Sequence, residues 1–144
     1  SEPGCLKQLL EIHEKTQSSV LGVFSASENQ VSNYGVISSK NIDGIEKVDG
    51  IVEKPKPADA PSNLAVFGRY ILSKDIFLNI EQTKPGLNNE IQLTDAIQDL
   101  ISNQNVFALE FEGRRFDCGS KEGYISAIID RASSIDKYKS IIEK

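Results

Sequence analysis

The sequence predicts an α/β domain with a mixed, layered sheet, and two observations support this fold class. Short apolar, β-favouring runs alternate along the chain with segments whose apolar residues recur at helical spacing. In addition, two extended segments, residues 34–41 and 45–52, are joined by residues suited to a tight turn, Asn41 to Gly44. A hairpin set among alternating strands and helices indicates a sheet with both parallel and antiparallel neighbours.

The helices are predicted from apolar residues spaced three and four apart. The first covers residues 4–16, and Ser73 is the expected cap of a short helix that carries Ile76 and Ile80. A third helix has its apolar face over residues 93–101. A long last helix is expected from the apolar stripe of Tyr124, Ile125, Ile128, Ile129, Ala132 and Ile135.

The remaining strands are expected over residues 20–26 and 63–72 and in an extended pair, 106–111 with 115–118. Gly68 indicates a bulge or a close backbone approach, and Asp49-Gly50 indicates a local irregularity. We find no internal repeat and no linker, so residues 1–144 are interpreted as a single piece.

Composition excludes several classes of protein. Among 144 residues, 39% are hydrophobic and 26% charged, with a net charge of −5 and no basic cluster beyond Arg114-Arg115, so a nucleic-acid surface is not expected. No apolar run is long enough to cross a membrane. Cys5 and Cys118 lack metal-binding spacing and are interpreted as thiols of a cytoplasmic protein. The chain opens at Ser1 and has no methionine, which suggests a partial chain.

Glu53 and Lys54 are the first candidate site residues. They close an apolar strand and precede a stiff loop containing Pro55, Pro57 and Pro61. A carboxylate can accept hydrogen bonds from two vicinal hydroxyls, and an ammonium can hold a phosphate as a point charge. Spacing alone favours a solvated surface pair, whereas the position at a strand end favours a binding rim.

Further candidates lie in three other segments. Asp117 ends an extended segment before Gly119, where a carboxylate can bind Mg²⁺, although one carboxylate is too few for a metal site and a turn role is the plain alternative. Gly35 either forms a turn or leaves a backbone amide open to a ligand. Glu90 precedes a helix, which its charge alone would stabilise. His13, the only histidine, is interpreted as structural.

Taken together, four segments carry a resemblance. YGVI, VEKPKPADAPSNLAVFGRYIL, NNEIQLTDAI and FDCGSKEGYISAI occur in the order and approximate spacing of bacterial UTP–glucose-1-phosphate uridylyltransferases. Over nearly its whole length the chain resembles the carboxyl-terminal half of these enzymes. EIQLTDAI and the DCG-K-GY pattern separate it from the related thymidylyltransferases. The resemblance implies an incomplete, Rossmann-like nucleotide-diphospho-sugar transferase fold, of which only the carboxyl-terminal half is present.

The resemblance also implies a reaction and residue roles. A phosphate oxygen of glucose 1-phosphate would attack the α-phosphorus of UTP, with Mg²⁺ bridging the phosphates, to give UDP-glucose and pyrophosphate. Lys54 would hold the sugar phosphate and, with Asp117, would be catalytic, and Asp117 would be one of two metal aspartates. The other implied substrate-binding residues are Gly35 and Glu53 at the sugar, Val66, Gly68 and Tyr70 along its side, and Glu90 as a support of the pocket.

The chain departs from the family in lacking the G-x-G-T-R loop, the PK segment and the first metal aspartate. We therefore expect UTP and UDP-glucose to require an amino-terminal half, and the isolated chain to be inactive. The alternatives are a non-catalytic sugar-phosphate-binding module and a subunit-association module. A halved sheet would expose an edge or an apolar face, so a homo-oligomer is expected.

Overall fold

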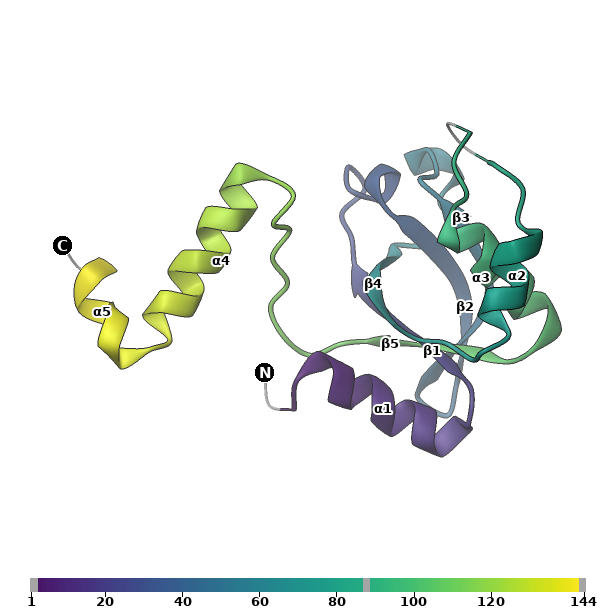
Figure 1. Ribbon diagram of the computed structural model, residues 1–144, viewed down its shortest axis with the longest axis horizontal. Helices are drawn as coiled ribbons and strands as arrows, with labels where there is room; N and C mark the ends of the chain where they lie inside the picture. The colour runs from purple at the N-terminus through teal and green to yellow at the C-terminus, as the bar shows by residue number, and fades with distance from the viewer. Residues whose placement is uncertain (1–2, 87–88, 143–144) are drawn as a thin grey trace. The chain divides into compact units, whose positions relative to one another are not determined.

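The structure, a computed structural model, describes residues 3–86 and 89–142 (Figure 1). Their contacts fall into two compact units, Ser1–Glu112 and Gly113–Lys144. The first unit holds the sheet with α1, α2 and α3, and the second holds α4 and α5. The sequence predicts one piece.

The sheet of the first unit is mixed, as predicted. Its strands follow one another in the order β1-β4-β2-β3-β5 and close into a ring. β1 and β5 pair in parallel, whereas the other neighbours are antiparallel. The strands are β1 (Ser19–Ser25), β2 (Gly35–Ile42), β3 (Ile45–Glu53), β4 (Leu64–Ile71) and β5 (Val106–Glu110).

Of the two consequences expected of a halved sheet, an open edge or an exposed apolar face, the open edge does not occur among the strands that the structure describes. The β2–β3 hairpin curls until Glu46 and Lys47 of β3 pair with Ala108 and Phe107 of β5. The curl has a local cause, because the register shifts between Ser38 and Ser39 and leaves Asp49 of β3 without an opposite residue. Such a bulge bends a strand and increases its twist. The irregularity predicted at Asp49-Gly50 is thereby confirmed.

The helices differ from the prediction mainly at their ends. They are α1 (Cys5–Thr16), α2 (Ile76–Gln82), α3 (Leu93–Asn103), α4 (Lys121–Ser133) and α5 (Asp136–Ile142). Ser73 does not cap α2, since the residue at the cap position is Asp75, whose side chain makes no capping hydrogen bond. Ser73 contacts the start of α2 through its backbone, because its carbonyl accepts a 3.2 Å hydrogen bond from the Ile76 amide.

The predicted single last helix is in fact two. The amide of Ser134 donates to the carbonyls of Asp130 and Arg131, and its hydroxyl donates to the Arg131 carbonyl at 2.7 Å. The Ile135 amide then donates to the Ala132 carbonyl, three residues back instead of four, so the α-helical pattern stops and α4 ends before α5 begins at Asp136. Ile135, the last member of the predicted stripe, therefore lies between two helices.

The predicted strand over residues 115–118 is also absent, because that segment is not part of any ladder in the described chain. β5 was its expected partner. A strand has two edges, and those of β5 are occupied by β1 and β3. The chain instead leaves the sheet after Glu110 and passes through Gly113, whose φ is 151°.

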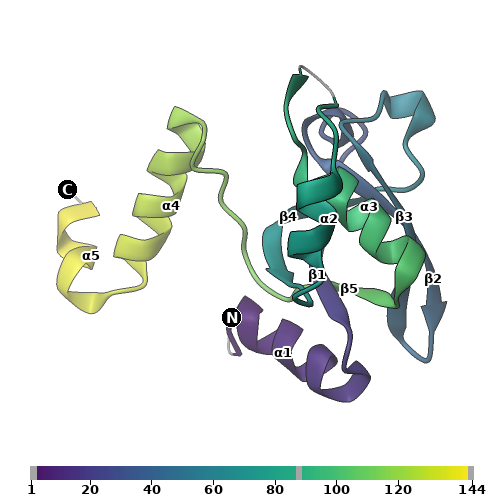
Figure 2. The ribbon, with the colours of Figure 1, turned by 45° about the vertical axis from the view of Figure 1, so that its right-hand side comes forward.

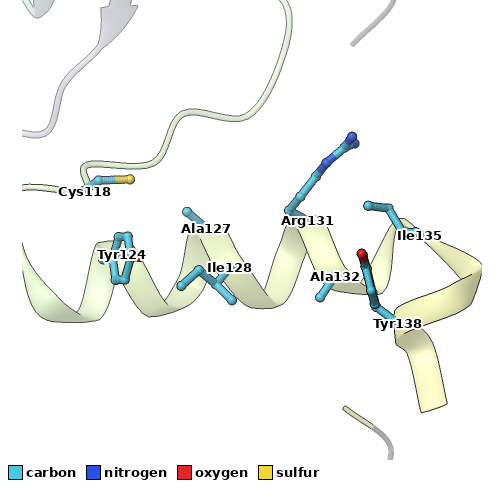
Figure 3. A pocket seen from close by; sticks show the side chains of 8 residues that line it. All are labelled: Cys118, Tyr124, Ala127, Ile128, Arg131, Ala132, Ile135 and Tyr138. Atoms are coloured by element: carbon cyan, nitrogen blue, oxygen red, sulfur yellow. The ribbon is translucent and has the colours of Figure 1, made fainter. Parts of the chain in front are cut away.

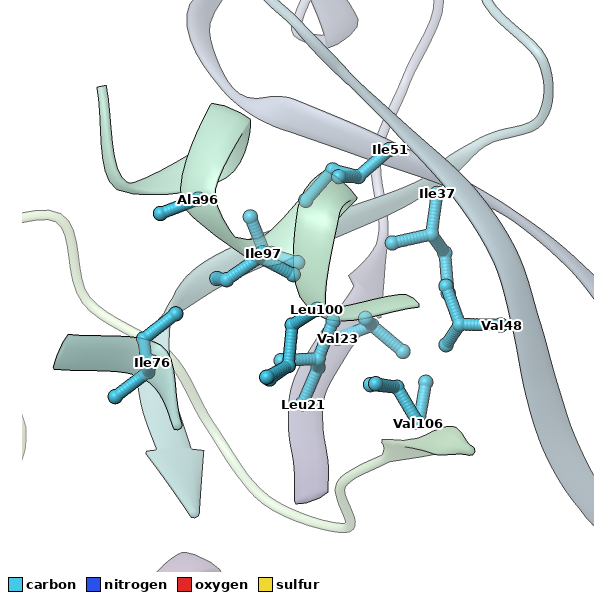
Figure 4. Close-up of a cluster of buried hydrophobic side chains, with 12 residues drawn as sticks. Leu21, Val23, Ile37, Val48, Ile51, Ile76, Ala96, Ile97, Leu100 and Val106 are labelled. Atoms are coloured by element: carbon cyan, nitrogen blue, oxygen red, sulfur yellow. The ribbon is translucent and has the colours of Figure 1, made fainter. Parts of the chain in front are cut away.

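The core of the first unit lies between the strands and the α2–α3 pair. Figure 4 shows side chains of both helices and of the strands directed toward one another; they are Leu21, Val23, Ile37, Val48, Ile51, Ile76, Ala96, Ile97, Leu100 and Val106. α1 packs on β1, β4 and β5, and Figure 2 shows it on a different side of the strands from α2 and α3. The layered α/β arrangement is confirmed. Within the described residues, no helix has the length and apolar character needed to cross a membrane.

Candidate functional site

The end of β3 brings Glu53 and Lys54 together. In an extended strand, neighbouring side chains point to opposite faces. Lys54 leaves the extended conformation with φ of 45°, a value that side-chain-bearing residues rarely adopt, and its amide donates a 3.0 Å hydrogen bond to the Tyr34 carbonyl. Its Nζ then lies 3.6 Å from Oε1 of Glu53. Both charges are therefore placed where one ligand can contact them.

The side chains of Glu53 and Lys54 differ in solvent exposure. The Glu53 side chain is 16% exposed, whereas that of Lys54 is 43% exposed. A pair that reaches solvent in this way contributes little to folding stability. The lysine is therefore free to exchange its carboxylate partner for a phosphate without a large loss of stability.

Gly35 of β2 pairs with Glu53 of β3 in the β2–β3 ladder. A Cβ atom at Gly35 would meet Cγ2 of Thr94 at 2.8 Å, Cγ2 of Val66 at 3.1 Å and Oε2 of Glu53 at 3.3 Å. Three predicted site residues, Gly35, Glu53 and Val66, are thus close together. We refer to these three residues and Thr94 as the Gly35 cluster.

Thr94 is the member of the cluster that the sequence analysis did not single out. It lies in the first turn of α3 and is 8% exposed. A signal was present in its spacing, because Thr94 lies three residues before Ile97 on the buried side of the helix. A polar residue in an otherwise apolar helix face is a candidate for a functional role.

Tyr70 and Gly68 belong to a bulge in β4. Gly22 of β1 lies opposite the three residues Phe67, Gly68 and Arg69, where the β1–β4 register shifts, and Gly68 has φ of 77°. The predicted bulge is confirmed. Burial raises the pKa of Tyr70, and the negative charge of Glu53 raises it further. A hydrogen bond with the Gly68 backbone lowers the pKa in part. The phenol therefore stays protonated and within the electrostatic reach of Glu53.

Glu90 is placed differently. It is exposed in the loop before α3, where its carbonyl accepts a 2.8 Å hydrogen bond from the Gly86 amide. Its Oε2 accepts a 3.1 Å hydrogen bond from Nε2 of Gln92, the residue at the cap position of α3. These contacts hold the loop together, and the role of Glu90 as a support of the pocket stays a prediction.

In the second unit, Asp117 is the first residue of a tight turn into α4. Its Oδ1 accepts a 3.0 Å hydrogen bond from the Gly119 amide, and its carbonyl accepts one from the Ser120 hydroxyl. Ser120 in turn caps α4 by accepting from the Gly123 amide at 3.0 Å. A Cβ at Gly123 would lie 1.9 Å from the Asp117 carbonyl oxygen, so this turn requires glycine there.

The donor chemistry of Asp117 suits Mg²⁺ as one ligand. Its carboxylate is 54% exposed, with Nη1 of Arg115 4.0 Å from Oδ2. Mg²⁺ prefers a few carboxylate oxygens completed by phosphate and water. Within residues 3–86 and 89–142, however, no group of three or more histidine, cysteine, aspartate or glutamate side chains could hold a metal ion. Asp117 therefore fits the role of a single Mg²⁺ ligand.

The second unit also carries an apolar groove of about 320 Å³ along α4 and α5 (Figure 3). Arg131 provides the charged group among walls that are otherwise mainly apolar. The lining residues are Cys118, Tyr124, Ala127, Ile128, Arg131, Ala132, Ile135 and Tyr138. Such walls suit packing against another apolar surface better than they suit phosphate chemistry.

The sequence of this chain is similar to those of known proteins. The nucleotidyl transferase family model matches residues 4–134. A UTP–glucose-1-phosphate uridylyltransferase 2 of Streptococcus pyogenes serotype M3 is 46% identical over 128 residues, which cover 88% of this chain and 43% of that protein. The chain therefore spans less than half the length of this relative.

Solved structures of similar sequence superpose on this chain. A UDP-glucose pyrophosphorylase complexed with UDP-glucose is 44% identical and superposes with a TM-score of 0.84, over 90% of this chain and 49% of the other. A UTP-bound UGPase from Acinetobacter baumannii is 34% identical with a TM-score of 0.79, over 94% of this chain and 47% of the other. The expected fold class, a partial nucleotidyltransferase fold, is confirmed.

Proposed function

The chain belongs to the nucleotidyl transferase family, and on that premise we propose that it supplies the glucose 1-phosphate site of a UTP–glucose-1-phosphate uridylyltransferase. The whole enzyme would join UTP and glucose 1-phosphate to give UDP-glucose and pyrophosphate. One observation carries the proposal: the Glu53 carboxylate and the Lys54 ammonium lie 3.6 Å apart at the end of β3, where Gly35 of β2 is the ladder partner of Glu53. Hydroxyls and a phosphate are the ligands that such a pair recognises.

Each residue has a proposed task. Glu53 accepts hydrogen bonds from two sugar hydroxyls, and Lys54 turns from Glu53 to the sugar phosphate when the ligand enters. Val66 and the protonated Tyr70 line the sugar side, and Gly68 provides the bulge that positions Tyr70. Phosphoryl-type transfer requires mainly positioning and charge neutralisation from the protein, and the proposed tasks of Glu53 and Lys54 are of these two kinds.

Asp117 is the proposed Mg²⁺ ligand of this chain. The metal would supply charge neutralisation of the reacting phosphates. We propose that the remaining ligand and the groups that bind the uridine lie in the part of the relatives that this chain does not cover. On this proposal the chain alone binds glucose 1-phosphate but does not catalyse uridylyl transfer, and a cytoplasmic location remains the expectation for the enzyme.

A second candidate function, subunit association, is favoured by apolar side chains of α4. Four large ones are about half exposed: Tyr124 at 56%, Ile125 at 55%, Ile128 at 50% and Ile129 at 47%. Exposed apolar side chains grouped in this way promote self-association. Light scattering of the purified chain across a concentration series tests this candidate, since a monomer at every concentration contradicts it.

Calorimetry with glucose 1-phosphate tests the sugar-phosphate site. The wild-type chain should bind, and Glu53→Gln, which removes the charge but keeps the shape, should weaken binding about tenfold. The matched control is Asp49→Asn on the same hairpin, where Asp49 pairs with Lys40 at 3.2 Å in solvent. Equal affinity for wild type and Glu53→Gln, or no heat from the wild type, contradicts the proposal.

A further inference from the structure

Two side-chain hydroxyls of the first unit are buried without a hydrogen-bond partner among the residues that the structure describes. They belong to Thr94 and Ser73. A buried hydroxyl that lacks a partner costs free energy, so its presence calls for a compensating role. The two differ in their surroundings: Thr94 belongs to the Gly35 cluster, whereas Ser73 follows β4 at the opposite end of that strand.

The methyl group of Thr94, not its hydroxyl, faces the cluster. Cγ2 lies 2.8 Å from the Cβ position of Gly35, and Oε2 of Glu53 lies 3.3 Å from that same position. Threonine in a helix populates two χ1 rotamers, so a rotation about χ1 can place the hydroxyl where the methyl lies. In that rotamer Oγ1 would stand beside the Cβ position of Gly35, which Oε2 of Glu53 also approaches.

We propose that the Thr94 hydroxyl is a binding group for a hydroxyl of the hexose 1-phosphate and that it contributes to the choice among hexoses. This inference rests on the proposed function, because it uses the same sugar site. A carboxylate only accepts hydrogen bonds, whereas a threonine hydroxyl both donates and accepts. A sugar hydroxyl can donate to Glu53 and accept from Thr94 at the same time. A hexose that lacks this hydroxyl, or carries it in the opposite configuration, would lose both hydrogen bonds.

The proposal predicts opposite effects of one substitution on stability and on binding. Thr94→Val keeps the shape and removes the hydroxyl. The unliganded chain should be equally or more thermostable, with a Tm raised by up to about 4 °C, because a buried unpaired group is lost. Affinity for glucose 1-phosphate should fall roughly five- to tenfold. Thr94→Ser keeps the hydroxyl and should bind within about twofold of the wild type.

Ser73→Ala is the matched control, since it also removes a buried unpaired hydroxyl. Its affinity for glucose 1-phosphate should equal that of the wild type. Calorimetry with monodeoxy analogues of glucose 1-phosphate then identifies the contacted hydroxyl. One analogue should bind the wild type more weakly than glucose 1-phosphate does but lose no further affinity in Thr94→Val.

The outcomes separate this inference from the proposed function. No binding by the wild type overturns both. Binding that Glu53→Gln weakens and Thr94→Val leaves unchanged overturns the inference alone, as does a set of analogues in which none couples to Thr94. A marked fall in Tm for Thr94→Val also overturns it, because the hydroxyl would then be paired within the folded chain.

Discussion

The Nζ of Lys54 lies 3.6 Å from Oε1 of Glu53, although the two residues are neighbours at the end of a strand. Strand geometry would send their side chains to opposite faces. The backbone of Lys54, at φ of 45°, removes that alternation, and Pro55 follows immediately. The pair is therefore formed by a strained residue, and strain of this kind is concentrated at ligand sites.

The strain at Lys54 can be tested with two substitutions that both remove the ammonium. Lys54→Gly relieves the left-handed conformation and Lys54→Ala retains it, so the glycine variant should be more stable by about 1 kcal/mol. Both variants should bind glucose 1-phosphate at least about tenfold more weakly than the wild type. Urea denaturation measures the first effect and calorimetry the second.

Asp43 provides the control for this comparison, because it has φ of 51° in the turn between β2 and β3. Asp43→Gly should likewise be more stable than Asp43→Ala, without any change in affinity for glucose 1-phosphate. Equal stabilities of the two Lys54 variants would contradict the strain at that residue.

Gly35→Ala should destabilise the chain by about 1–3 kcal/mol, because the new methyl overpacks the contact with Thr94. The added Cβ would stand 2.8 Å from Cγ2 of Thr94. Combining it with Thr94→Ser, which removes that methyl, should restore part of the loss, so the two effects should not be additive. Urea denaturation of the single and double variants measures the coupling.

Gly4→Ala is a suitable control for Gly35→Ala. Gly4 has φ of −63° and nothing within 4 Å of its Cβ position, so an alanine meets no obstacle. The change should leave the free energy of unfolding within about 0.5 kcal/mol of the wild type. Strict additivity of Gly35→Ala and Thr94→Ser would argue against the close packing described for the cluster.

Local patterns predicted much of this fold. The β2–β3 hairpin, its irregularity at Asp49 and the bulge at Gly68 each follow from short-range signals, namely turn residues and a glycine within an apolar run. Glu53 and Lys54 were found in the same way, from their position before a proline-rich loop.

The features that sequence reasoning missed depend on contacts between distant segments. The ring closes because β3 reaches β5, and the contact between Thr94 and Gly35 joins residues far apart in the chain. Neither is encoded in a local period. The end of α4 was missed for another reason: the helical hydrogen-bond pattern stops at Ile135, whose amide donates to the Ala132 carbonyl, while the apolar spacing includes that residue.

Gly123→Ala should disrupt the turn that presents Asp117. The new Cβ would lie 1.9 Å from the Asp117 carbonyl oxygen, so the Ser120 cap and the first turn of α4 must move apart. We expect faster amide hydrogen exchange at residues 119–124 and unchanged exchange in β1, which lies in the first unit. Gly119→Ala, whose Cβ would be 3.1 Å from the Asp117 carboxylate, should have a smaller effect. An unchanged exchange pattern in Gly123→Ala would contradict this turn geometry.

The purified 144-residue chain should form no UDP-glucose above background from UTP, glucose 1-phosphate and Mg²⁺. The reason is that the groups proposed to bind the uridine and to complete the metal site lie in the part of the relatives that this chain does not cover. A coupled pyrophosphate assay measures the rate, with a full-length relative as the positive control. Turnover by the chain that Asp117→Asn abolishes would overturn this prediction and indicate a complete site.

Tyr70 should make the stability of the chain depend on alkaline pH. Burial raises the pKa of its phenol, with the Glu53 charge adding to the effect. The folded state then binds the proton more tightly than the unfolded state, whose tyrosine has a pKa of about 10. The stabilising contribution is complete below about pH 10 and is lost as the pH rises through the higher pKa of the folded state.

Urea denaturation between about pH 8.5 and 11 should therefore show a decline in the free energy of unfolding. Tyr70→Phe should reduce this decline, whereas Tyr124→Phe, at a residue that is 56% exposed, should leave it unchanged. A decline of equal size in Tyr70→Phe and in the wild type would show that another group is responsible.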